Sequence, residues 1–152
     1  MKSRRPTKWV TWENVGVDRI ACAWLIRKYI DSNAAFVFVS PQQKTLPKGA
    51  EPFDIPGARL SHHRGHCSFH AMLKAYKLNE PILNRIARII DEADTVQEVL
   101  LEPAAAGLDL ICEGIRLVSD SDQAAIDRGA LVFDALYCKL KRLEEEGPAD
   151  RN

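Results

Sequence analysis

The N-terminal part of the chain constrains the fold most, because two strand-like runs flank a helix-like run within residues 8–39. Residues 8–13 are rich in tryptophan, valine and threonine, which favour a pleated, half-buried surface. Residues 35–39 form an apolar run of strand length with β-branched valines. A helix of the intervening length is the usual connection between parallel strands. The sequence therefore predicts two neighbouring parallel strands joined by a crossover helix.

The crossover helix is predicted at residues 18–30. Its apolar residues wrap most of a helical cylinder, which indicates burial on more than one side. Asp18 precedes these residues and is a suitable N-cap. The apolar positions are Ile20, Ala23, Trp24, Leu25, Ile26, Tyr29 and Ile30.

After residue 40 the sequence pattern changes twice, first to a loop and then to helices. Residues 41–57 contain four prolines and two glycines, which predicts a loop with an edge strand at 51–55. A further short strand is expected at 58–62. After Gly65 the pattern becomes helical. Four helices are predicted: 69–78, capped by Ser68; Pro81 to about 93; Pro103 to about 118; and a last helix to about 143, preceded by a capping box of Asp120 and Gln123.

The helix that begins at Pro81 has the clearest core-facing pattern, with six apolar residues within about 120° on a helical wheel. In the last helix, Gly129 indicates a kink or a point of close packing. We expect an α+β protein with a small N-terminal mixed sheet and a crossover helix, followed by a mainly helical C-terminal part. The six apolar residues are Ile82, Leu83, Ile86, Ile89, Ile90 and Ala93.

Length and composition indicate one globular domain. With 152 residues, 46% of them hydrophobic and 28% charged, the chain can bury a core of its own. We expect a single domain over residues 1–152, with its core at about 8–143. Four cations lie within Met1–Lys8, but the apolar run that follows is too short for a signal peptide, and no stretch approaches a membrane span. A cytoplasmic protein without a membrane partner is expected.

The balance of charges argues against a nucleic-acid partner. Lysine and arginine together number 21, as do aspartate and glutamate, so the chain lacks the positive field of a typical nucleic-acid binder. No nucleic-acid partner is expected for this domain. A small oxyanion or a metal ion is the expected ligand, and a homodimer is compatible with the long last helix.

Six short segments, in the same order along the chain, resemble the chromate-resistance protein family. They extend over nearly the whole domain, from about residue 8 to 140. The resemblance implies a role in chromate resistance or response, and it corresponds to the C-terminal domain of the chromate-responsive regulator. The segments are 18–26, Phe53–Gly57, Ser61–His63, Cys67–Phe69, Ile89–Ile90 with Ala93–Asp94, and Val132–Tyr137.

The resemblance also indicates two differences from the longer relatives. Those relatives carry a preceding segment associated with chromate-dependent regulation, so a stand-alone domain is expected here without the DNA-contacting half. In some relatives an acidic residue stands at the place of His70 and a histidine at that of Asp91. The polar cluster is therefore expected to have exchanged partners at these two positions.

All four histidines lie close together, which makes this segment the candidate metal site. His62, His63 and His66 lie in a loop that ends at Cys67, and His70 follows on the first turn of a helix. Imidazole is the commonest metal ligand in proteins, and thiolate and carboxylate extend the donor set. A transition metal such as zinc or iron is therefore the expected cofactor. We refer to residues 62–67 as the histidine loop.

Two aspartates could complete this site from the isoleucine-rich helix. Asp94 lies at the border of its apolar face, and Asp91 lies about 60° further round on the same side. If the histidine loop packs over this helix end, His62, His70, Asp91 and Asp94 would form one metal site, with His63 and His66 as bystanders. In the alternative, Asp91 pairs with Arg88, Asp94 only marks the helix end, and the histidines are solvated.

Cys67 is the candidate catalytic residue among four cysteines that include no Cys-x-x-Cys pair. A helix N-terminus and Arg64 would favour its thiolate, which would suit redox chemistry, although a buried packing role is an equal alternative. Cys22, Cys112 and Cys138 are expected to be buried apolar residues.

Arg19 and Arg64 are the candidate ligands for an oxyanion, because a guanidinium presents a fork of donors to a tetrahedral anion. Ordinary surface ion pairs are the alternative for both arginines.

Three functions remain open from the sequence. The first is a metal-dependent or thiol-dependent enzyme that acts on chromate or on products of chromate stress. The second is a non-catalytic sensor that binds a metal or oxyanion and passes a conformational signal to a partner. The third is an interaction protein that dimerises through the last helix. The sequence does not decide whether the protein is an enzyme.

Overall fold

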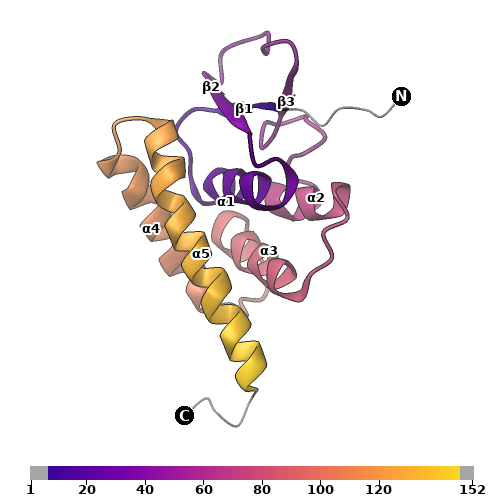
Figure 1. Cartoon of the computed structure of the whole chain (residues 1–152), viewed down its shortest axis with the longest axis vertical. Helices are drawn as coiled ribbons and strands as arrows, with labels where there is room; N and C mark the ends of the chain where they lie inside the picture. Colours follow the sequence, from indigo (N-terminus) through magenta and orange to yellow (C-terminus); the bar gives the residue numbers. More distant parts are fainter. Residues whose placement is uncertain (1–6, 148–152) are drawn as a thin grey trace.

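The computed structural model describes residues 7–147 and places a small sheet at one end of a helical body (Figure 1). Residues 1–6 and 148–152 lie outside the described range, and with them most of the basic segment Met1–Lys8. The elements are β1 (Lys8–Trp12), α1 (Val17–Leu25) with a π-helical continuation (Ile26–Ile30), β2 (Ala35–Val39), β3 (Ala50–Pro52), α2 (Ser68–Ala75), α3 (Pro81–Asp94), α4 (Ala104–Val118) and α5 (Asp122–Glu146). The α+β class is confirmed.

The sheet has the strand order β2-β1-β3, and both neighbours run parallel to β1. The predicted parallel pair is therefore confirmed, but the sheet is parallel throughout its named strands and not mixed. The edge strand expected at 51–55 is shorter and includes Pro52, which an edge strand tolerates because its missing N–H interrupts no inner ladder. The strand expected at 58–62 is reduced to one bridge between Leu60 and Phe53.

α1 begins at Val17 with Gly16 as its N-cap, so the prediction that Asp18 caps this helix is wrong. Asp18 lies inside the first turn and is only 2% exposed. Its side chain accepts hydrogen bonds from the backbone N–H groups of Ser68 and Phe69 at the start of α2, at 2.7 and 3.0 Å. The carboxylate of α1 thus caps α2.

The other helix starts agree with the sequence to different degrees. α3 begins at Pro81 as predicted, and the Glu80 side chain accepts from the first free backbone amides. Ser68 is the first residue of α2 and not its cap, because Asp18 satisfies the amides there. The N-cap of α5 is Ser121 and not Asp120, since the Ser121 hydroxyl accepts from the N–H of Ala124.

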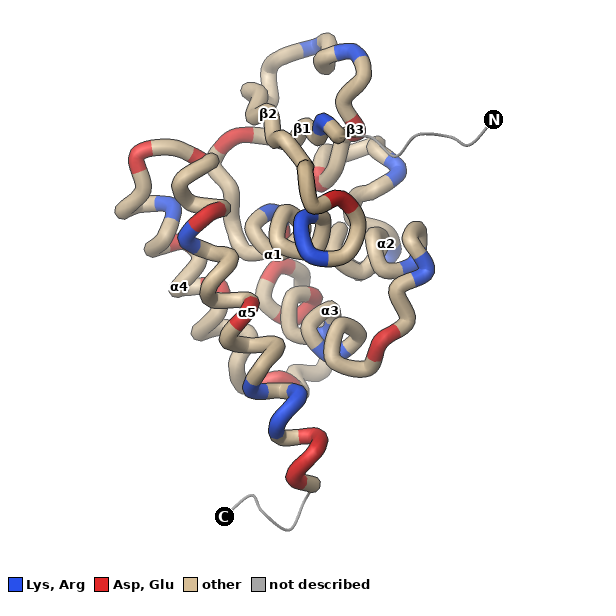
Figure 2. Tube along the Cα trace, viewed as in Figure 1, with Lys and Arg blue, Asp and Glu red and all other residues tan. Residues whose placement is uncertain are grey.

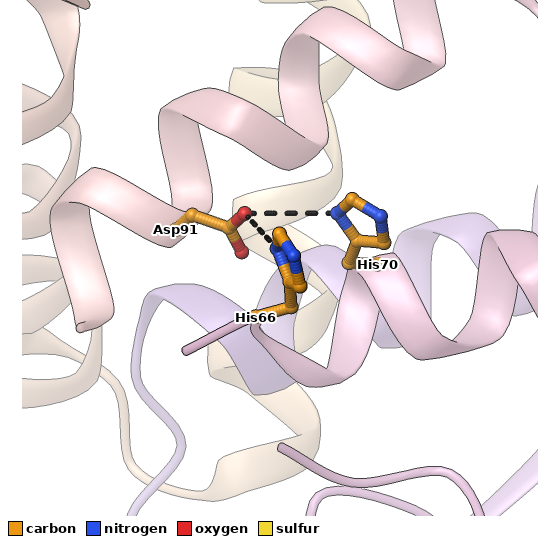
Figure 3. Close-up of side chains that lie close together, drawn as sticks. All are labelled: His66, His70 and Asp91. Atoms are coloured by element: carbon orange, nitrogen blue, oxygen red, sulfur yellow. Dashed lines mark hydrogen bonds and ion pairs between the residues drawn. The ribbon is translucent and has the colours of Figure 1, made fainter. Parts of the chain in front are cut away.

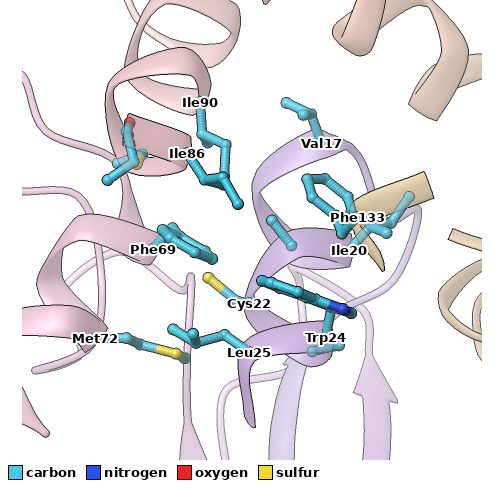
Figure 4. Close-up of a cluster of buried hydrophobic side chains, with 14 of the residues drawn as sticks. Val17, Ile20, Cys22, Trp24, Leu25, Phe69, Met72, Ile86, Ile90 and Phe133 are labelled. Carbon is cyan, nitrogen blue, oxygen red and sulfur yellow. Dashed lines mark hydrogen bonds between the residues drawn. The ribbon is translucent and has the colours of Figure 1, made fainter. Parts of the chain in front are cut away.

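α1 lies at the centre of the helical body, in contact with each of α2, α3, α4 and α5. Figure 4 shows Trp24, Phe69, Ile86 and Phe133 among the side chains buried around it. A Cβ atom at Gly129 would lie 2.3 Å from Cγ2 of Ile20, so the glycine permits α5 to pack closely against α1. The predicted close-packing role of Gly129 is confirmed.

The described surface shows no simple separation of charge. Lys and Arg residues are interspersed with Asp and Glu residues along the trace (Figure 2). Among the described helices, none is both long enough and apolar enough to cross a bilayer.

Candidate functional site

The histidine loop is a tight hairpin. The backbone N–H of His63 donates to the carbonyl of His66 at 3.0 Å, and the N–H of His66 donates back to His63 at 2.9 Å. The two residues between them, Arg64 and Gly65, both have positive φ, at 49° and 81°, as a type I′ turn requires. Successive side chains of an extended segment point to opposite sides, so His62 and His63 line different pockets.

His62 reaches a cluster of three carboxylates on one side of the loop. Its Nε2 atom lies 2.9 Å from Oδ2 of Asp18, 3.0 Å from Oδ2 of Asp94 and 3.4 Å from Oδ1 of Asp54. These four residues, here called the acidic site, border a pocket of ≈ 410 Å³. They come from α1, from the loop after β3, from the histidine loop and from the end of α3.

Asp18 is held in the acidic site by several hydrogen bonds. Besides His62 and the two α2 amides, its carboxylate accepts a hydrogen bond from the Cys22 thiol at 3.5 Å. Burial raises the pKa of Asp18 above its ordinary value, and the hydrogen bonds from His62, Ser68 and Phe69 oppose that rise. The side chain is therefore fixed by the fold before any ligand binds.

The surroundings in the acidic site raise the pKa values of His62 and Asp94. Hydrogen bonds to Asp18 and Asp54 raise the pKa of His62 to about 10, although partial burial opposes the rise. Burial, together with repulsion from Asp18 and Asp54, raises the pKa of Asp94 to about 7. At neutral pH an imidazolium therefore sits among the carboxylates and balances part of their charge.

Arg19, a predicted oxyanion ligand, lines the pocket of the acidic site but is already engaged. Its Nε atom lies 3.1 Å from Oδ2 of Asp54, and one terminal nitrogen donates to the Asp54 carbonyl at 3.1 Å. The guanidinium also lies 5.6 Å from the centre of the Trp12 ring. Arg19 therefore positions Asp54, and its guanidinium has fewer N–H donors left to bind an anion.

A second cluster lies on the other side of the loop and is shown in Figure 3. Nδ1 of His66 lies 2.9 Å from Oδ2 of Asp91, and Nδ1 of His70 lies 3.6 Å from the same oxygen. The centres of the two imidazole rings are 4.2 Å apart. We call His66, His70 and Asp91 the imidazole site.

The structure thus divides the single site that the sequence predicted. His62 meets Asp94, whereas His70 meets Asp91, and the two pairs belong to different clusters. Asp91 and Asp94 lie about 60° apart around α3, as expected, but each contacts a different histidine. His66, expected to be a bystander, contacts Asp91.

Two residues of the acidic site, Asp18 and Asp54, had no site role in the sequence-based interpretation. Both belong to segments that carry the family resemblance, which was the only available signal. Their contacts with His62 depend on the packing of distant segments, which periodicity does not report.

Cys67 is buried at this helix start, which favours its packing role over the expected thiolate. Its side chain is 0% exposed, and burial raises the pKa of the thiol far above its ordinary value, with repulsion from Asp18 and Asp91 adding to the rise. Desolvation therefore outweighs the helix dipole and Arg64. Cys22 and Cys112 are buried as predicted, but Cys138 is exposed, contrary to expectation.

Arg64, the second predicted oxyanion ligand, lines a pocket of ≈ 800 Å³ next to the imidazole site. The described residues that line this basic pocket include no carboxylate. Its charged and imidazole members are Arg59, His63, Arg64, His66, His70 and Lys74.

Comparison with known proteins gives one consistent result. The family described as ChrB, C-terminal domain, matches residues 9–140. Protein ChrB of Cupriavidus metallidurans (strain CH34) is 34% identical over 131 residues, which are 86% of this chain and 40% of that protein. The chain therefore spans less than half the length of this relative. No solved structure matches the chain.

Proposed function

This chain belongs to the ChrB C-terminal domain family, and from that premise we propose that it serves chromate resistance or the response to chromate through a divalent metal ion held at the acidic site. Asp18, His62 and Asp94 would supply the ligands, with Asp54 beside them. The proposal keeps the metal expected from the sequence and changes its ligand set, because His70 and Asp91 lie in the other cluster.

The spacing of the donor atoms carries the proposal. Atoms bound to one metal ion at about 2.1 Å are separated from one another by about 3 to 3.4 Å. Nε2 of His62 lies 2.9, 3.0 and 3.4 Å from the three carboxylates. Nitrogen and oxygen donors of this kind suit zinc or iron.

The charge of the acidic site favours a cation over an oxyanion. Three carboxylates face the pocket, and Arg19 already pairs with one of them, Asp54. A dianion would meet like charge there, whereas a divalent cation would replace the proton that His62 holds among the same oxygens. The oxyanion ligand expected from the sequence is therefore not placed at this site.

Through Asp18, a metal ion at the acidic site would contact a residue that also holds the start of α2. The same carboxylate that faces His62 holds the first amides of α2, so a cation bound there would act on both the histidine loop and the start of α2. Such a link suits a module that senses a ligand. The pocket of ≈ 410 Å³ also leaves room for a small substrate beside the ion, so the same site would be compatible with an enzyme.

The test is elemental analysis of untagged protein purified without chelator, with Asp94→Asn and His62→Gln as site variants. Asp120→Asn is the matched control, since it removes an exposed carboxylate between α4 and α5. We expect each site variant to lose one equivalent of a transition metal that the wild type and Asp120→Asn retain. Equal metal content in all four proteins after reconstitution with zinc or ferrous ion would overturn the proposal.

A further inference from the structure

The imidazole site has a donor set that the proposed metal at the acidic site does not use. We infer that His66, His70 and Asp91 hold a second divalent transition-metal ion, and that a small anion drawn from the basic pocket completes its coordination. This ion is separate from the one proposed above, and either can be absent without the other.

The chemistry of the three donors fits a transition metal. His66, His70 and Asp91 each offer one ligand atom, and these three atoms lie within 4.8 Å of one another. Two imidazoles and one carboxylate form a set that binds ions such as Fe²⁺ and leaves coordination positions open. Figure 3 shows both rings presenting a nitrogen to the same carboxylate oxygen, Oδ2 of Asp91.

Asp91 is held in the orientation that a ligand needs. The residue is 6% exposed, and its Oδ1 atom accepts the backbone N–H of Cys67 at 2.7 Å. That bond fixes the carboxylate and leaves Oδ2 directed at the two imidazoles. Hydrogen bonds of this kind orient the ligands of known metal sites.

His70 distinguishes a metal site from a simple ion pair. Its Nδ1 atom is buried, and no hydrogen bond reaches it within the described part of the chain. Buried polar atoms are nearly always paired, so this nitrogen requires an explanation. A proton shared by His66 and Asp91 accounts for one imidazole only, whereas a cation bound by all three residues also satisfies His70.

The surroundings of the imidazole site favour an anion as a further ligand. Among the described residues, no carboxylate lines the basic pocket, while Arg59, Arg64 and Lys74 all do. Arg59 is paired with Glu51 at 2.9 Å, but Arg64 and Lys74 form no ion pair among the described residues. A bound divalent cation would add to this positive charge, so a small anion is the ligand that the pocket selects.

Co²⁺ is the probe for the metal, because its visible spectrum reports its ligands. Chelator-treated protein is titrated with Co²⁺, and the amount bound is measured after gel filtration. We expect two equivalents for the wild type, one for Asp94→Asn, one for His70→Gln and none for the double variant. Asp120→Asn is the control, since it removes an exposed carboxylate outside both sites, and it should bind two equivalents.

The possible outcomes separate the two metal proposals. One equivalent in the wild type and none in Asp94→Asn would overturn the imidazole site and leave the acidic site standing. One equivalent in the wild type and Asp94→Asn, and none in His70→Gln, would do the reverse. A circular dichroism spectrum like that of the wild type shows that each variant is folded.

Sulfate is the probe for the anion, added to Co²⁺-loaded Asp94→Asn at constant ionic strength. We expect a saturable change in the visible spectrum and about tenfold weaker sulfate binding in Arg64→Gln, from the loss of one charge-assisted hydrogen bond. A spectrum that sulfate leaves unchanged would overturn the anion ligand.

Discussion

Oδ2 of Asp18 lies 2.9 Å from Nε2 of His62, although the two residues are 44 positions apart in the sequence. The same carboxylate accepts the backbone amides of Ser68 and Phe69. Asp18 therefore joins the central helix α1 to the histidine loop and to the start of α2. Its contacts are part of the fold as well as part of the candidate site.

Asp18→Ala is expected to destabilise the metal-free protein by about 3 to 5 kcal/mol. The substitution leaves two buried amides without an acceptor and removes one of the three carboxylates around His62, and each unsatisfied buried group costs about 1 to 3 kcal/mol. Urea denaturation measures the loss. Asp120→Asn serves as the control and should stay within about 0.5 kcal/mol of the wild type. A loss below about 1 kcal/mol for Asp18→Ala would show that water replaces the carboxylate.

The stability of the metal-free protein is expected to fall as pH rises from about 6.5 to about 10. The folded state raises the pKa of His62 from 6.5 to about 10, so it binds a proton more tightly than the unfolded chain. That contribution is complete below pH 6.5 and is lost as pH passes 10. Asp94, with its pKa raised from 3.8 to about 7, acts in the same direction at lower pH.

Urea denaturation at a series of pH values tests this dependence, with His62→Gln as the comparison. The wild type should lose more stability than the variant between pH 7 and 10. Parallel curves for the two proteins would show that His62 titrates normally. Because the His62 side chain is 43% exposed, we predict the sign of the difference and not its size.

The sequence predicted the positions of those elements whose local side-chain pattern agrees with their packing in the fold. The isoleucine stripe and Pro81 located α3, and the two apolar runs on either side of α1 located the parallel pair β1 and β2. In each case the side-chain period or a proline reports directly on the backbone.

The acidic site was only partly predictable, because it depends on contacts between distant segments. Asp18 looked like an N-cap from its place before an apolar run, but packing turns it toward α2. The Arg64-Gly65 turn separates His62 from His66, and this dipeptide is a weaker hairpin signal than Asn-Gly. The loop was therefore expected to converge on one site, although its histidines divide between two.

Alkylation of the native protein is expected to modify one cysteine, Cys138. This residue is exposed, whereas Cys22, Cys67 and Cys112 are buried and burial raises the pKa of each of these thiols. Treatment with iodoacetamide at pH 7.5 (about one unit below the ordinary thiol pKa), followed by peptide mass spectrometry, gives the answer. Rapid labelling of Cys67 would restore the thiol-dependent enzyme as an explanation.

Two glycine-to-alanine substitutions are expected to have opposite effects on stability. Gly129→Ala places a Cβ atom 2.3 Å from Cγ2 of the buried Ile20, and overpacking of this kind costs about 1 to 3 kcal/mol. At Gly107 in α4 nothing lies within 4 Å of the added atom, so alanine should stabilise the helix by about 0.5 to 1 kcal/mol. Thermal denaturation of both variants tests the packing of α5 on α1. A stabilised Gly129→Ala would contradict that packing.

Metal binding at the acidic site is expected to release between one and two protons at pH 7, one from His62 and part of one from Asp94, whose pKa is raised to about 7. His62 is protonated at that pH because its pKa is raised to about 10, and it must lose the proton to coordinate a cation. Calorimetric titration of His70→Gln with zinc, in two buffers that differ in protonation enthalpy, counts the protons while the imidazole site is disabled. The apparent affinity should also rise by at least about tenfold per pH unit between 6 and 8, more steeply below pH 7 where Asp94 is also protonated. Release of less than one proton would mean that the ion uses the carboxylates alone, because His62 would then keep its proton beside them.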